Sequence, residues 1–100
     1  MFGFSKKDIP EKKIRDWQKR YQIDKIVEVA KNGTTTSRLR AIGVLQEINM
    51  SQVKTQLIKL LEDNNEAIAL RAADALESMG LVHEERELVA ACRKKHGKTK

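Results

Sequence analysis

The apolar residues of this 100-residue chain recur every three or four positions, in six stretches separated by polar or glycine-containing breaks. In the first stretch Ile14, Trp17 and Tyr21 follow this spacing, and Pro10 stands where the first turn of a helix accepts a proline. A spacing of three and four residues is typical of amphipathic α-helices. The pattern therefore predicts six helices, over about residues 10–21, 23–32, 37–48, 52–61, 68–79 and 83–95.

The breaks between the stretches contain residues that begin and end helices. We expect Gly33 to end the second helix in a left-handed conformation, and the polar run 34–37 to cap the third. Ser51 is the predicted cap of the fourth helix, and Asn64 or Asn65 that of the fifth. Because the connections are two to five residues long, successive helices should be antiparallel neighbours. The predicted fold class is all-α.

The apolar pattern also repeats at a fixed distance of 31 residues. Residues 39–48 return as residues 70–79, and Ile26, Leu57 and Leu88 stand 31 positions apart. A period of 20 to 50 residues indicates stacked units that bury their apolar faces against one another. We therefore expect an α-α superhelix, a short solenoid of about six antiparallel helices, with a flexible segment at 1–9, one repeat domain at 10–96 and a basic tail at 97–100.

Residues 60–68 read Leu-Leu-Glu-Asp-Asn-Asn-Glu-Ala-Ile, and residues 72–80 read Ala-Ala-Asp-Ala-Leu-Glu-Ser-Met-Gly. These segments resemble the short HEAT-like repeats first described in phycobilisome lyases, and the resemblance covers about residues 24–92. It implies an α-solenoid in which the second helix of each pair lines the concave side. Some HEAT-like proteins are lyases or DNA glycosylases, but no set of residues in this chain would carry either activity.

Charge is distributed unevenly along the chain. Residues 1–20 carry a net charge of +4, residues 21–85 of −3, and residues 86–100 of +5. A nucleic-acid groove usually concentrates its basic residues along one structured face, whereas here the basic residues gather at the two ends. We expect nucleic-acid binding to be weak and non-specific. An accessory protein that binds nucleic acid through its basic termini remains the alternative hypothesis.

Arg40 and Arg71 occupy equivalent positions on consecutive second helices. They could present guanidinium groups to a partner, or they could form ion pairs between repeats, for example from Arg40 to Asp74. The residues predicted to surround them are of mixed charge, which suits a protein partner. The leading hypothesis is a non-enzymatic scaffold that binds another protein through Arg40, Gln46, Glu47, Arg71, Asp74, Glu77 and Ser78. A regulatory subunit related to HEAT-like lyases is a further alternative.

Cys92 and His96 have the spacing of two metal ligands on one helix, and His83 begins that helix. Zinc needs three or four ligands, however, and Cys92 falls on an apolar position of the repeat, which favours a buried structural thiol. No catalytic triad or phosphate-binding loop is present in the sequence. We expect no metal, no cofactor and no catalytic residue. Trp17 is predicted to cover the N-terminal end of the stack.

The N-terminal residues Phe2, Phe4, Lys6 and Lys7 could form a minimal membrane anchor, although a disordered or folded-back terminus is the preferred interpretation. The sequence contains no secretory signal and no apolar run of the roughly 18 residues that a membrane span needs. With a single cysteine, a cytoplasmic location is expected. We predict a monomer, with a dimer as the alternative because only two helix pairs are complete.

Overall fold

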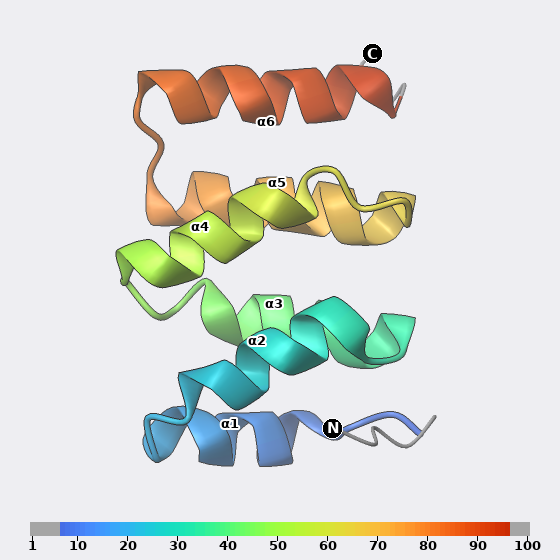
Figure 1. The fold of residues 1–100 in the computed structure, drawn as a ribbon, viewed down its shortest axis with the longest axis vertical. Coiled ribbons are helices and arrows are strands. Elements are labelled where there is room, and N and C mark those ends of the chain that lie inside the picture. The colour runs from blue at the N-terminus through green and yellow to red at the C-terminus, as the bar shows by residue number, and fades with distance from the viewer. Residues whose placement is uncertain (1–6, 97–100) are drawn as a thin grey trace. The chain divides into compact units, whose positions relative to one another are not determined.

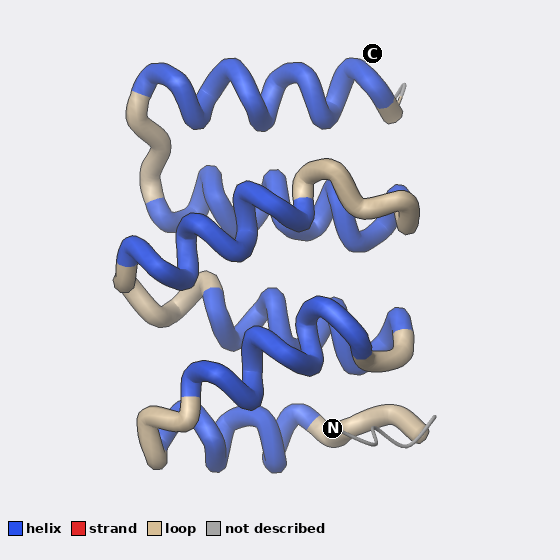
Figure 2. The backbone as a smooth tube through the Cα atoms, viewed as in Figure 1, coloured by secondary structure: helices blue, strands red, loops and turns tan. Residues whose placement is uncertain are grey.

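The computed structural model describes residues 7–96, and over this range the chain forms six α-helices and no strand (Figures 1 and 2). This confirms the predicted all-α fold class. In Figure 1 α2 and α3 run antiparallel, as do α4 and α5, and then α5 and α6. No helix in the described range is both long and apolar enough to cross a membrane. The helices are α1 (Glu11–Lys19), α2 (Ile23–Asn32), α3 (Thr35–Leu45), α4 (Ser51–Leu60), α5 (Glu66–Met79) and α6 (His83–Lys95).

The chain divides into two compact units, Met1–Leu45 and Gln46–Lys100, where the sequence predicts one domain. In the first unit α1 packs on α2 and α3, and α2 packs on α3. In the second unit α5 packs on both α4 and α6. This arrangement is expected of repeats, since each helix buries its apolar face mainly against its neighbours along the chain. The predicted basic tail at 97–100 and the aromatic residues Phe2 and Phe4 lie outside the described residues.

Burial follows the 31-residue repeat in its first two copies and departs from it in the third. Ile26 and Leu57 are completely buried, but Leu88, their equivalent on α6, is 45% exposed. The prediction that Leu88 points inward is therefore wrong. The second-helix partners α3 and α5 cover α2 and α4, whereas no further helix follows α6 within residues 7–96. Val89 and Cys92 are buried on α6, and the burial of Cys92 confirms the structural thiol that its repeat position predicts.

Several helix ends differ from those predicted. α3 ends at Leu45, so Ile48 lies outside it, and Ser51 is the first residue of α4 with its side chain making no cap. Gly33 is extended (φ −76°, ψ −176°) rather than left-handed. Position 33 has no room for a larger residue, because a Cβ atom there would lie 2.9 Å from the carbonyl oxygen of Val29.

Two predicted caps are confirmed by hydrogen bonds. The side-chain oxygen of Asn65 accepts hydrogen bonds from the backbone N–H groups of Ala67 and Ile68 at the start of α5. The hydroxyl of Thr34 accepts one from the N–H of Ser37 at the start of α3. In each case the cap pairs N–H groups that the first turn of a helix leaves without a partner.

Tyr21 lies outside the apolar stripe to which the sequence pattern assigned it. Its side chain is 87% exposed and its backbone is left-handed, with φ at 60°. The N–H of Gln22 donates to the carbonyl of Trp17 and that of Tyr21 to the carbonyl of Gln18. This pair of bonds usually ends a helix on a glycine. Tyr21 therefore belongs to the turn that ends α1, not to the core.

Trp17 is half-buried on α1, and two amines approach its ring. The Nζ atoms of Lys13 and Lys25 each lie 5.9 Å from the ring centroid. Such cation–π contacts are favourable and keep the exposed part of the ring covered by long side chains. Because Lys25 comes from α2, the contact joins the first two helices of the unit.

Candidate functional site

Four of the seven predicted binding residues lie together on α5. Arg71, Asp74, Glu77 and Ser78 recur at spacings of three and four residues, opposite the buried side of the helix, which is formed by Ala72, Ala73 and Leu76. Asp74, Glu77 and Ser78 are exposed, and Arg71 is half-buried. We call these four residues the α5 surface. It carries both signs of charge within two helical turns.

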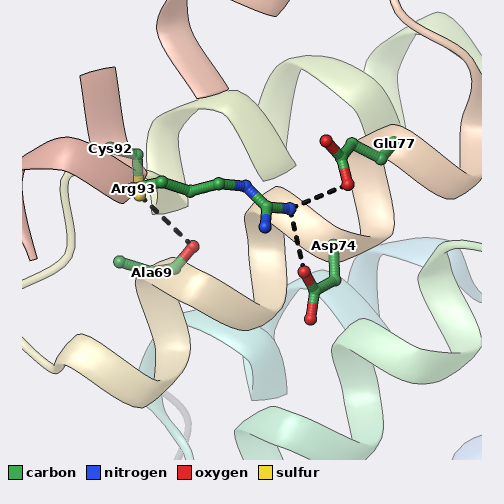
Figure 3. A network of polar contacts seen from close by, with 5 residues as sticks. All are labelled: Ala69, Asp74, Glu77, Cys92 and Arg93. Carbon is green, nitrogen blue, oxygen red and sulfur yellow. Dashed lines mark hydrogen bonds and ion pairs between the residues drawn. The ribbon is translucent and has the colours of Figure 1, made fainter. Parts of the chain in front are cut away.

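A side chain that the sequence analysis did not select organises the two carboxylates of this surface. Arg93 of α6 donates from Nη2 to Asp74 Oδ1 at 2.9 Å and to Glu77 Oε1 at 2.8 Å (Figure 3). The guanidinium thus holds both carboxylates beside each other and ties α6 to α5. Nothing in the repeat indicated this role, because the equivalents of Arg93 are Lys31 and Glu62.

Arg71 differs from these residues because it makes no hydrogen bond or ion pair within the described part of the chain. Its long side chain therefore keeps all five N–H donors of the guanidinium for other groups. On the α5 surface it is the cation that a binding partner could engage without displacing an existing contact.

Arg40, the equivalent of Arg71 in the first unit, is used structurally. Its Nη1 atom donates to the carbonyl of Ile9 at 3.0 Å, and the N–H of Ile9 donates to Ser37 Oγ at 2.7 Å. Thr34 Oγ1 adds a 2.6 Å hydrogen bond to Asp8 Oδ1. The boundary predicted at residue 10 therefore falls within a hydrogen-bonded segment. Arg40 and Asp74, which could have formed an ion pair, each have a partner within their own unit.

Gln46 and Glu47 stand in the turn that opens the second unit, before α4. Gln46 is half-buried and Glu47 is exposed. Neither residue lies on a helix, although the predicted third helix would have included both. Their place in a turn follows from the end of α3 at Leu45.

The thiol of Cys92 is buried on α6, and its Sγ atom lies 3.6 Å from the carbonyl oxygen of Ala69. Burial raises the pKa of this thiol, because desolvation disfavours the thiolate. A neutral, buried thiol is a poor nucleophile and a poor metal ligand. Within residues 7–96 no group of three or more His, Cys, Asp or Glu side chains is placed to hold a metal ion.

A further ion pair joins α6 to α4. Lys54 Nζ lies 2.8 Å from Glu85 Oε1, and the same oxygen accepts a hydrogen bond from the N–H of Val82 at 3.1 Å. The hydrogen bond from Lys54 is the main reason why the pKa of the Glu85 carboxyl lies below its usual value, and the bond from Val82 adds to it. Glu85 thus supports the start of α6 as well as its contact with α4.

Compared with known proteins, the chain matches no protein-family model, no curated protein and no solved structure.

Proposed function

We propose that this chain is a non-enzymatic module that binds another protein through the α5 surface. The observation that carries the proposal is the arrangement of charge on that surface. Arg93 holds Asp74 and Glu77 beside each other, while Arg71 has no partner within the described residues. A surface of fixed carboxylates beside an available guanidinium offers complementary charges to a partner that presents both signs.

The same arrangement disfavours a polyanion as the main ligand. Asp74 and Glu77 would repel phosphate groups, and Arg93 is already engaged with both carboxylates. Binding to nucleic acid through the basic termini would depend on counterion release and would weaken steeply with added salt. The proposal thus favours a folded protein partner over DNA or RNA.

The proposed architecture is a short HEAT-like solenoid. The buried positions Ile26 and Leu57, together with Ala30 and Leu61, support a 31-residue helix pair as the repeating unit. In a solenoid of this kind the second helices present the binding residues, and α5 is a second helix. This supports the choice of α5 over α4 as the helix that meets the partner.

Affinity purification of the full chain from its native cells, with Arg71→Glu as the test variant, would examine the proposal. Reversing the only positive charge of the four-residue α5 surface should cost about 2 kcal/mol of binding free energy, roughly a thirtyfold weaker Kd. The melting temperature should stay nearly unchanged, because Arg71 has no hydrogen bond or ion pair to lose within the described chain.

Lys59→Glu is the matched control, since Lys59 is an exposed cation on α4 of the same unit. The partner should be lost with Arg71→Glu and retained with Lys59→Glu. If both variants retain the partner at the wild-type level, the α5 surface is not the binding site. Arg40→Glu is unsuitable for this purpose, because Arg40 holds the carbonyl of Ile9.

A further inference from the structure

The face of α6 that carries Leu88 is open to solvent. Together with α4 it forms a pocket of about 280 Å³, lined by the apolar residues Ile58, Leu61, Leu88, Ala91 and Cys92 and edged by Glu62 and Lys95. The equivalents of Leu88 in the first two copies of the repeat are completely buried. The repeat therefore places an apolar contact residue on α6 where the described chain supplies nothing to cover it.

A stripe of four residues runs along this face of α6. Glu84, Leu88, Ala91 and Lys95 follow one another at spacings of four, three and four residues, so they share one side of the helix. The stripe is acidic at its N-terminal end, apolar in the middle and basic at its C-terminal end. Glu84 and Lys95 are exposed, and neither makes an ion pair within the described residues.

The order of residues in the stripe is self-complementary. If a second α6 is laid antiparallel on the first about a twofold axis at the middle of the stripe, Glu84 of each copy faces Lys95 of the other. Leu88 of each copy then lies over the small side chain of Ala91. A twofold interface requires this kind of pairing, in which one patch of surface matches itself.

We propose that the stripe Glu84, Leu88, Ala91 and Lys95 is the interface of a twofold dimer, in which α6 of a second copy of this chain packs antiparallel on α6. Charge complementarity selects this occupant. The helix dipole alone explains an acid early and a base late in α6, but it does not explain the exposed leucine between them on the same side. The dimer covers Leu88 and pairs both charges.

The expected association is weak. α6 has 13 residues, and a helix of that length is about 20 Å long. One pair of such helices buries less than the roughly 800 Å² per partner of a standard protein interface. We therefore expect a dimer that forms at micromolar concentrations and dissociates on dilution.

Sedimentation equilibrium of the full chain over a range of concentrations is the first test. The wild-type chain should reach the mass of a dimer, and Leu88→Glu should remain a monomer. Met50→Glu is the control, because Met50 is similarly exposed (40%) in the same unit but lies away from the stripe in sequence, before α4. A wild-type chain that stays monomeric at millimolar concentration would overturn the proposal.

A charge exchange tests the antiparallel pairing itself. Glu84→Lys and Lys95→Glu, each studied alone, should weaken self-association about tenfold or more, because each places two like-charged pairs in the interface. An equimolar mixture of the two variants should associate again, since their heterodimer restores two opposite-charge pairs. If either variant dimerises as tightly as wild type, or if the mixture associates no better than its components, α6 does not pair in this way.

Discussion

The two copies of the repeat, α2–α3 and α4–α5, share their apolar positions but not their polar contacts. Ile26 and Leu57 are both completely buried, as are Leu45 and Leu76. Yet Arg40 in the first copy binds a backbone carbonyl, and the equivalent Arg71 in the second has no partner among the described residues. Apolar spacing thus determines which side of each helix is buried, whereas neighbouring segments determine the use of each polar side chain.

The largest expected effects are losses of stability at the apolar positions of the repeat. Leu57→Ala and Ile26→Ala should each lower the free energy of unfolding by about 2 to 5 kcal/mol, because each leaves a cavity in a closed core. Leu88→Ala should cost less than about 1 kcal/mol, since Leu88 is 45% exposed. Urea denaturation of dilute protein measures all three. Equal losses at positions 57 and 88 would show that the third copy is as closed as the second.

The two arginines provide the next largest contrast. Arg40→Ala should destabilise the chain by about 1 to 2 kcal/mol, because it removes a charged donor from the half-buried carbonyl of Ile9. Arg71→Ala should change stability by no more than about 0.5 kcal/mol. Thermal melts of the two variants compare them directly, and a larger loss for Arg71→Ala would reverse the assigned roles.

A smaller effect is expected where helices end on a left-handed residue. Gly80 ends α5 with a positive φ of 93°, and Tyr21, after α1, also has a positive φ, of 60°, although it is not a glycine. Tyr21→Gly should stabilise the chain by roughly 0.5 to 1 kcal/mol, since relief of backbone strain exceeds the added entropy of an unfolded glycine. Denaturation of this variant beside Tyr21→Ala, which keeps the strain, separates backbone strain from loss of the ring.

The smallest expected effect is a dependence of stability on acid pH, which arises from Glu85 in the second unit. Because the pKa of Glu85 is lowered from 4.5 in the folded chain, its contribution to stability is complete above pH 4.5 and is lost as the pH falls through the lowered value. Lys54→Ala should flatten this part of the stability profile, because Lys54 is the main cause of the shift. Urea midpoints of the wild-type chain and of Lys54→Ala, measured across the acid range, would show this flattening. An identical pH profile for the two proteins would contradict the prediction.

Sequence alone was sufficient for the number and type of the helices, but not for all their ends. Ile48 and Met79 occupy the same repeat position, yet Met79 is helical and Ile48 is not. The apolar spacing continues through both residues, so it cannot locate the last turn. The stop at Gly80 was predictable because glycine adopts φ 93° easily. Tyrosine rarely adopts a positive φ, so the residue type of Tyr21 did not indicate that it follows the end of α1.

The candidate site was predictable only in part. The spacing of Arg71, Asp74 and Glu77 placed them on one side of a helix, and the structure has them there. The role of Arg93 depends on how far a long side chain reaches from a neighbouring helix, which periodicity does not encode. The exposure of Leu88 escaped prediction for a related reason. Its position in the repeat indicates burial, and only the arrangement of the helices shows that nothing in the described chain covers it.

The repeated apolar positions also bear on the fidelity of folding. α2 and α4 offer similar apolar faces, so α2 could pair with α5, or α4 with α3, while the chain collapses. Such a mispaired intermediate would bury similar apolar area. In the correct pairing Arg38 Nε of α3 donates to the carbonyl of Ala30 on α2, and Lys54 of α4 pairs with Glu85 of α6. A pairing of α2 with α5 loses the first of these contacts, because Ala69 stands at the position equivalent to Arg38. We expect these polar contacts to make the correct helix pairing more stable than a mispaired one during folding.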